Sequence, residues 1–223
     1  MPLVNQTQVR PDIGFSFANG LRTLMRQDPD IIMVGEIRDN ETASLAINAA
    51  LTGHLVLSTL HTNSAAGAMP RFLDMGAEPF LLVTTLRVVV AQRLVRKLCK
   101  VKEEYHLTKD EIATLRKSVD LERVVEALKA EKIVDKKATI ETIPFYRAKK
   151  SADCEEGYKS RIGIHEVMKM SPAIKELVIK NATSDEIEAQ AKKEGMLTML
   201  EDGIFKAAQG ITTIEEVLRV VSE

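Results

Sequence analysis

The segment MRQDPDIIMVGEIRD, residues 25–39, decides the fold when it is read together with LSTLHTN, residues 57–63. Each segment holds a short apolar run followed by a titratable side chain, Glu36 in the first and His61 in the second. The residues between them have helical spacing, so the pattern predicts a strand, a helix and a second strand. A right-handed crossover makes the two strands parallel and brings their carboxyl ends to one edge of the sheet, where open α/β sheets bind ligands. We therefore expect Glu36 and His61 to be neighbours in a site.

The composition excludes several classes of protein. The 223 residues are enough for one large domain or two small ones. A net charge of −1 and an aromatic content of 4% disfavour nucleic acid as a partner, and a DNA-translocating motor in particular, because base stacking needs aromatic side chains. No apolar run reaches the length of a membrane span, so we expect no direct membrane insertion. The start of the chain has no signal-peptide pattern, and two cysteines make no disulfide framework, so we expect a reducing cytoplasm.

The first hundred residues alternate between helical and strand patterns. The run Ile31–Val34 predicts a strand buried on both faces of a parallel sheet. Residues 54–60 predict its neighbour. Capping residues and apolar spacing predict helices over about 16–27, 41–52 (capped by Asn40) and 64–75, with another after Pro79. Residues 87–98 contain Val88-Val89-Val90, which favours a strand, but their wider spacing fits a helix, and we predict a helix there.

The character of the chain changes at about residue 99. Lys and Glu become more frequent, apolar runs shorten, and a helical pattern covers about 109–131. Residues 162–167 then suggest a strand or a hairpin, and capping signals predict three short helices to the end. We therefore predict an α/β fold in three parts: a core that holds the two parallel strands over 1–98, an inserted subdomain over 99–160 and a C-terminal helical subdomain over 161–223.

Two interpretations fit Glu36 and two fit His61. A carboxylate directly after a buried strand costs free energy unless it is paired, and an ion pair with Arg38 would satisfy it. Alternatively, Glu36 is the acid at the end of a Walker B strand, which holds magnesium through water or orients the attacking water. His61 is either a structural histidine or a contact to a nucleotide γ-phosphate. Hydroxyls of Thr59 and Thr62 lie close enough in sequence to join such a site.

The quoted residues closely resemble one family. MRQDPDIIMVGEIRD resembles the Walker B box of the ATPases of type II secretion and type IV pilus assembly, the GspE/PilB group, and AALTGHLVLSTLHTN, residues 49–63, resembles their histidine box. MGAEPFLL, AQRLVRKLC and YKSRIGIHEVM are similar to later segments of the same family. The resemblance covers most of residues 3–100 and 158–223.

The resemblance implies a partial RecA-like P-loop NTPase domain in a homohexamer that uses ATP and Mg²⁺. Glu36 corresponds to the Walker B glutamate, with magnesium bound through water, and His61 to the nucleotide-sensing histidine. Within this picture we assign the following residues to nucleotide binding: Gly35, Arg38, Asp39, Thr59 and Thr62. The family also implies a peripheral location at the cytoplasmic face of the inner membrane, through a polytopic platform protein.

The chain departs from the family pattern at the phosphate-binding loop. The family carries GxxxxGK[ST] upstream of the Walker B box, and this sequence contains no Gly-Lys pair. We therefore expect the chain to be the C-terminal part of a longer ATPase and to be inactive alone. The alternative is a non-catalytic interaction or oligomerisation module that has lost its phosphate-binding loop.

The second departure concerns metal. Assembly-type members of the family carry two CxxC pairs that hold zinc in the inserted subdomain. Here Cys99 is followed by Lys100-Val101-Lys102, and Cys154 has no second cysteine nearby. Two thiolates do not complete a tetrahedral site, so we expect no zinc. The insert itself favours an assembly or secretion ATPase over a retraction motor, because retraction members resemble a version without it.

Overall fold

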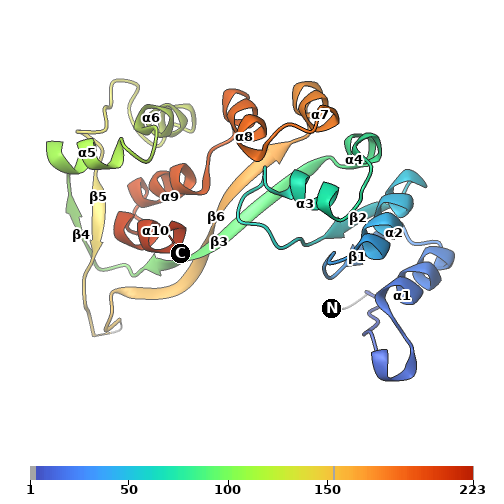
Figure 1. Ribbon diagram of the computed structural model, residues 1–223. Coiled ribbons are helices and arrows are strands. Elements are labelled where there is room, and N and C mark those ends of the chain that lie inside the picture. The colour runs from blue at the N-terminus through green and yellow to red at the C-terminus, as the bar shows by residue number, and fades with distance from the viewer. Residues whose placement is uncertain (1–3, 153, 223) are drawn as a thin grey trace. The chain divides into compact units, whose positions relative to one another are not determined.

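The structure is a computed structural model that describes residues 4–152 and 154–222 (Figure 1). The chain packs into two compact units. Unit 1 holds the residues up to Val89 together with Lys169–Ala191, and unit 2 holds Val90–Met168 together with the residues from Lys192 onward. These boundaries differ from the predicted three-part division, which remains a prediction about domains.

Unit 1 follows the predicted order of strand, helix and strand. Its elements are α1 (Phe17–Leu24), β1 (Ile31–Val34), α2 (Asn40–Leu51), β2 (Leu55–Ser58), α3 (Ala68–Asp74), α4 (Pro79–Thr85), α7 (Pro172–Ile179) and most of α8 (Ser184–Lys193), with short 3₁₀ turns at Pro11–Ile13 and Met25–Gln27. Ser16 caps α1, as its sequence position predicts, by accepting a hydrogen bond from the backbone N–H of Asn19. The cap of α2 is Asp39, one residue before the predicted Asn40.

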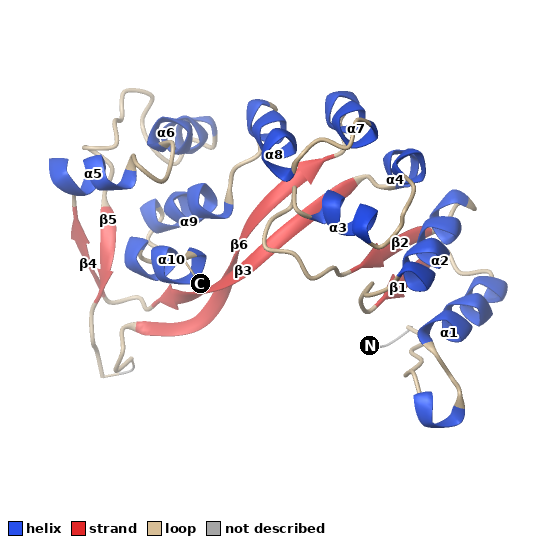
Figure 2. Ribbon diagram, viewed as in Figure 1, coloured by secondary structure: helices blue, strands red, loops and turns tan. Residues whose placement is uncertain are grey.

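Strands β1 and β2 are parallel, which confirms the prediction from the crossover rule (Figure 2). Ile32 and Val34 are buried on one face of the pair. The other face carries four large apolar side chains that are exposed by 48–73%: Ile31, Met33, Leu55 and Leu57. The register places Ile31 beside Leu55 and Met33 beside Leu57, so they form one continuous apolar surface, which we call the open sheet face. The prediction that β1 is buried on both faces is therefore wrong for the described residues, since no layer among them covers this side.

Unit 2 is built from two antiparallel strand pairs and four helices. Its elements are β3 (Val88–Leu98, beginning just before the unit boundary), β4 (Lys102–Tyr105), α5 (Lys109–Leu115), α6 (Leu121–Ala130), β5 (Phe145–Ala148), β6 (Tyr158–Lys169), α9 (Met199–Ala208) and α10 (Ile214–Val221). β4 pairs with β5, and β3 runs beside β6 in the opposite direction (Figure 2).

Three sequence predictions differ from the structure, and two of them lie in unit 2. The helix predicted over 87–98 is strand β3, because β6 supplies a pairing partner that local spacing does not reveal. The helical pattern over 109–131 is two helices, broken between Leu115 and Leu121. The end of the chain has four helices where three were predicted, and the additional capping box joins Thr198 to Glu201 at the start of α9.

One core joins the predicted insert to the final helices of unit 2. Leu128 of α6, Phe145 of β5 and Ile204 of α9 are at most 1% exposed and belong to the same hydrophobic cluster. A buried carboxylate supports this core from the side of β3. Glu216 of α10 accepts hydrogen bonds from the Arg96 backbone N–H and guanidinium and from the Arg219 guanidinium.

Candidate functional site at the carboxyl edge of strands β1 and β2

The two loops that follow β1 and β2 continue the contact between the strands. The backbone N–H of Ile37 donates to the carbonyl of Thr59 at 2.9 Å. The Thr59 hydroxyl donates to the carbonyl of Gly35 at 2.6 Å. These bonds hold residues 35–37 beside residue 59, so the side chains of the next positions emerge at the same edge of the sheet.

Glu36 and His61 meet at this edge. The His61 Nε2 atom lies 2.9 Å from Glu36 Oε2, and the Arg38 Nε–H donates to the same oxygen at 2.6 Å. The Glu36 side chain is 26% exposed, whereas the His61 ring is 78% exposed. The predicted proximity of Glu36 and His61 is confirmed, and both the ion pair with Arg38 and the contact with His61 are present.

The contacts of Glu36 favour its ionised form. The hydrogen bond from Arg38 and, after it, the one from His61 lower the pKa of the Glu36 carboxyl below its ordinary value of 4.5, against a smaller opposing effect of burial. The carboxylate therefore carries its negative charge throughout the neutral range. An ionised carboxylate can accept a proton or hold a water molecule in position, which are the tasks that hydrolysis requires of such a group.

We expect a titration of the Glu36 side-chain carboxyl by NMR to give a pKa below 4.5, and the Arg38→Ala variant to raise it. The stabilisation from these contacts is complete above the pKa of the unfolded chain and is lost as the pH falls through the lower pKa of the folded chain. Arg22→Ala is the matched control, because Arg22 pairs with Glu41 instead. An unchanged Glu36 titration in Arg38→Ala would contradict the assignment.

The remaining predicted ligands occupy defined positions. Asp39 caps α2 by accepting from the Thr42 N–H at 2.8 Å. The Thr62 hydroxyl donates to the carbonyl of Ser64 at 3.1 Å. Gly35 contributes its carbonyl to Thr59. The structure thus gives each of these residues a local structural contact, and their roles toward a nucleotide stay predictions.

A contact that sequence reasoning did not anticipate fixes the start of α2. The Asn40 side-chain amide donates to the carbonyl of Met75, at the end of α3, at 2.6 Å. Gly76 follows with φ of +81°, and a Cβ there would lie 2.6 Å from the Asn40 amide nitrogen. Glycine suits this position because it adopts the left-handed conformation without strain and leaves room for Asn40.

The residues at this edge fit a magnesium ion held through water. Mg²⁺ in nucleotide sites is bound by one or two carboxylates together with substrate phosphates and several waters. Both contacts of Glu36 fall on Oε2, and among the described residues Oε1 has no partner. No group of three or more His, Cys, Asp or Glu side chains within residues 4–152 and 154–222 is arranged to hold a metal by itself. Glu36 would therefore hold the ion together with water and phosphate oxygens, and the ion would supply the positive charge that neutralises the phosphates.

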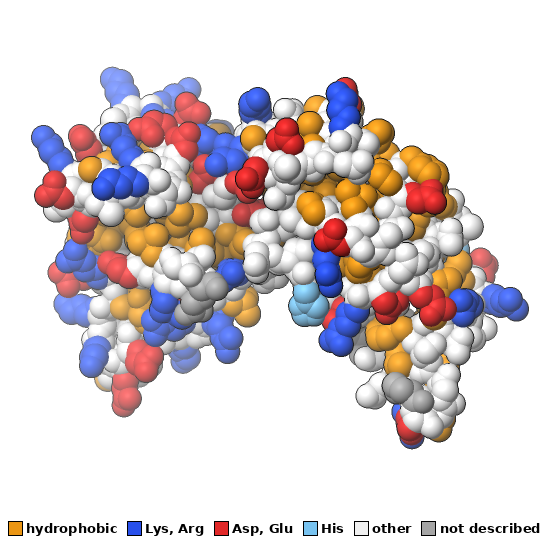
Figure 3. All heavy atoms as spheres, in the orientation of Figure 1, with side chains coloured by type: hydrophobic (Ala, Val, Ile, Leu, Met, Phe, Trp, Pro, Cys, Tyr) orange, Lys and Arg blue, Asp and Glu red, His pale blue; other side chains and the backbone are white. Residues whose placement is uncertain are grey.

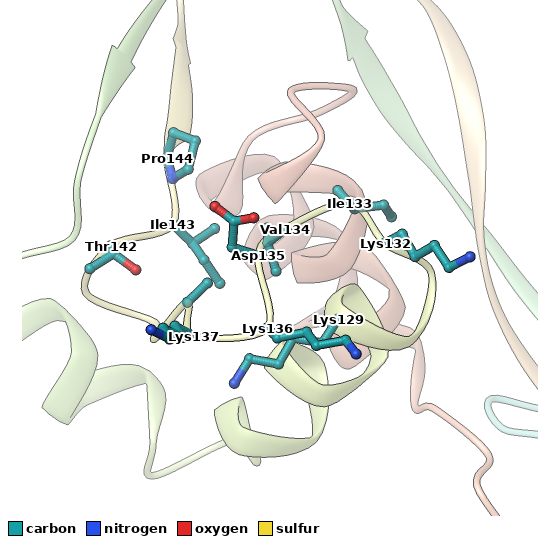
Figure 4. A pocket seen from close by; sticks show the side chains of 11 residues that line it. Lys129, Lys132, Ile133, Val134, Asp135, Lys136, Lys137, Thr142, Ile143 and Pro144 are labelled. Atoms are coloured by element: carbon teal, nitrogen blue, oxygen red, sulfur yellow. The ribbon is translucent and has the colours of Figure 1, made fainter.

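A hollow of about 740 Å³ lies in unit 2, around the loop between α6 and β5. Four lysines line it: Lys129, Lys132, Lys136 and Lys137. Figure 4 shows that their side chains extend in different directions, Lys129 from α6 and the other three from the loop. Figure 3 shows acidic and basic side chains mixed over α5 and α6. This surface does not converge on a ligand, so the edge of β1 and β2 is the stronger candidate.

Comparison with known proteins identifies the family. Residues 1–219 match the family model described as type II/IV secretion system protein. The chain belongs to this family. It is 48% identical over 221 residues to type II secretion system protein E of Xanthomonas campestris, covering 99% of this chain and 36% of that protein. It is 44% identical over 221 residues to the type IV pilus assembly ATPase PilB of Pseudomonas aeruginosa, again covering 36% of the relative.

The family assignment extends to solved structures. The pilus retraction motor PilT with bound ADP is similar, with a TM-score of 0.57 and 26% identity, over 92% of this chain and 43% of that one. This chain spans little more than a third of the length of the two sequence relatives described above. In the part of the chain that the structure describes, no helix is long and apolar enough to cross a membrane.

Proposed function

We propose that this chain supplies the hydrolytic half of an ATP site in a motor for type II secretion or type IV pilus assembly. The observation that carries the proposal is the contact of 2.9 Å between His61 Nε2 and Glu36 Oε2 at the carboxyl edge of a parallel strand pair. A lone acid after a strand has a structural explanation, but an acid paired with an exposed histidine at a ligand-binding edge fits a reacting phosphate better. Family membership supports the same reading.

The proposed roles follow from the geometry. Glu36 orients the attacking water and reaches magnesium through a second water. His61 is exposed and in contact with Glu36, so it contacts the γ-phosphate on one side and the Glu36 carboxylate on the other, and it links the two groups. Arg38 keeps Glu36 ionised and adds positive charge near the phosphates. Gly35, Thr59, Thr62 and Asp39 shape the two loops around the nucleotide.

The other half of the site grips the phosphates, and we propose that it belongs to residues outside this chain. A P-loop cradles phosphates with backbone N–H groups and a lysine, and the sequence has no Gly-Lys pair. The open sheet face supports this view, because exposed contiguous apolar patches mark surfaces that another element covers. A RecA-like core completed by further strands would cover Ile31, Met33, Leu55 and Leu57. The relatives contain residues beyond the matched region that could supply them.

At the level of the whole machine we propose a homohexamer at the cytoplasmic face of the inner membrane. It would act on a polytopic platform protein and use ATP hydrolysis to drive assembly of pilin-like subunits. Neither nucleic acid nor direct membrane insertion has a place in this proposal.

The rival candidate is a non-catalytic interaction module. It is favoured by one observation, the ion pair between Arg38 Nε and Glu36 Oε2 at 2.6 Å, which gives Glu36 a sufficient structural role without any nucleotide. The two functions differ in what the charge of Glu36 does. Hydrolysis needs an ionised carboxylate at position 36, whereas an interaction module needs only a folded edge.

We expect the purified chain, mixed with Mg²⁺ and ATP, to release no phosphate above the buffer rate, because the phosphate-gripping half is missing. A sensitive phosphate-release assay on homogeneous protein makes this measurement, with circular dichroism as the check that the chain is folded. Turnover by the chain alone that disappears in Glu36→Gln would contradict the division of the site into two halves.

A further inference from the structure

The two cysteines of the chain lie together in unit 2. Cys99 directly follows β3 and Cys154 precedes β6, and a disulfide joins them across 55 positions of sequence. The sequence predicted neither zinc nor a disulfide framework, so this pairing was not anticipated. The disulfide holds residues 99 and 154, the two ends of the segment between them, next to each other.

The backbone around the bond holds the two sulfurs in place. The Cys99 N–H donates to the carbonyl of Gly157 at 2.9 Å, and Ser151 and Cys154 exchange two backbone hydrogen bonds of 3.0 Å. Gly157 has φ of +75°, and a Cβ there would lie 2.9 Å from the Lys149 nitrogen. Gly157, three residues after Cys154, is therefore closely packed against the end of β5, and the disulfide joins Cys154 to Cys99.

The segment does not depend on this bond for its core. Leu121, Leu128 and Phe145 are at most 1% exposed and pack with residues of α9 and α10. Small domains that need disulfides are those without a sufficient core, and this one has such a core. We expect that breaking the bond would release Cys154 from Cys99 and leave this core in place.

A metal is the other ligand that two thiolates suggest. Structural zinc takes four protein ligands, and within the described residues no third His, Asp or Glu joins Cys99 and Cys154 in such a group. A covalent pair needs only the two sulfurs at the observed spacing of 6.7 Å between their Cα atoms, which lies within the range for disulfides.

We propose that Cys99 and Cys154 form a redox-reversible staple that closes the base of the segment 99–154. The oxidant is a low-molecular-weight disulfide such as glutathione disulfide. Cys99, which is half-buried, is more accessible than Cys154 at 8% exposed, so its thiolate attacks first, forming a mixed disulfide and releasing one glutathione thiol. The Cys154 thiolate then attacks the Cys99 sulfur and releases the second glutathione, and the two cysteine protons end on the two released thiols.

This proposal is independent of the ATP site. It concerns a covalent state of unit 2, and its readouts are chemical and thermal. Its failure would leave the proposed function intact, and the reverse holds as well.

The test uses the full chain equilibrated in glutathione disulfide or in dithiothreitol, quenched with N-ethylmaleimide and mapped by mass spectrometry. We expect an intramolecular peptide pair containing Cys99 and Cys154 in the first buffer and two blocked thiols in the second. The melting temperature should be about 5–15 °C higher in the oxidised form. The far-UV circular dichroism should be the same in both buffers.

The double variant Cys99→Ser, Cys154→Ser is the control for effects of the reagents. It should melt at one temperature in both buffers, equal to that of the reduced wild type. Two blocked thiols on folded protein after treatment with glutathione disulfide would overturn the proposal, and so would stoichiometric zinc on the reduced chain. A disulfide that dithiothreitol reduces only after the chain is denatured would contradict the proposal that the bond is reversible in the folded protein.

Discussion

A Glu36→Gln substitution is expected to lower kcat for ATP hydrolysis about 10²–10⁴-fold when the chain is part of a complete site. The substitution keeps the size of the side chain but removes the negative charge that positions the attacking water. The complete site can be made by replacing the matching segment of Pseudomonas aeruginosa PilB, which is 44% identical, with residues 1–223 of this chain. Phosphate release by the chimera gives the rate.

The matched control for this substitution is Glu41→Gln. Glu41 lies five residues further along, in the first turn of α2, where it pairs with Arg22 at the surface. It should leave kcat unchanged, and both variants should keep the oligomeric state of the chimera in sedimentation. A Glu36→Gln chimera that hydrolyses ATP within about threefold of the wild-type rate would favour the interaction module.

The Glu216→Ala variant is expected to destabilise unit 2 by about 2–4 kcal/mol, measured as a lower urea midpoint. The Glu216 side chain is fully buried, and five hydrogen bonds from Arg96 and Arg219 end on it. Both arginines are about half exposed, so water can solvate them after the substitution. The loss of stability is therefore smaller than it would be if a fully buried charge were left without a partner. Glu215→Ala, at an exposed neighbouring position of α10, should change the midpoint little.

The same carboxylate makes stability depend on pH. Burial raises the pKa of Glu216, but hydrogen bonds from Arg219 and Arg96 outweigh it and lower the pKa to about 2. Because the pKa is lower in the folded than in the unfolded chain, the stabilisation is complete above the unfolded value of 4.5 and is lost as the pH falls toward 2. Wild type and Glu216→Ala should therefore converge in stability at acid pH. A constant difference down to pH 2 would contradict this account of the arginine contacts.

The site was predictable because its signals are local. The apolar run at Ile31–Val34, the helical spacing after it and the second run at Leu55–Ser58 lie within thirty residues or so, and a chirality rule settles their arrangement. The contact between Glu36 and His61 follows from that arrangement alone. The family resemblance then added a ligand, which the residues by themselves did not specify.

The parts that were missed depend on distant partners. The segment 87–98 has β-branched residues and helical spacing at once, and pairing with β6, some sixty residues later, makes it a strand. Thr213 and Glu216 have the spacing of a capping box in the sequence, yet the Glu216 carboxylate accepts hydrogen bonds from Arg96. The meeting of Cys99 and Cys154 likewise depends on the path of the whole segment between them. The open sheet face was missed because an apolar strand has the same sequence pattern whether or not another layer covers its second face.

The central claim is that Glu36 and His61 act as one unit on a bound nucleotide. A double-mutant cycle tests it most directly, by measuring kcat for ATP hydrolysis in the chimera with His61→Asn in the wild-type and the Glu36→Gln backgrounds. We predict a loss of about tenfold or more in the wild-type background and less than about twofold in the Glu36→Gln background, because the partner of His61 is already disabled there. Equal fold-losses in both backgrounds would show that the two residues act independently and would contradict the claim.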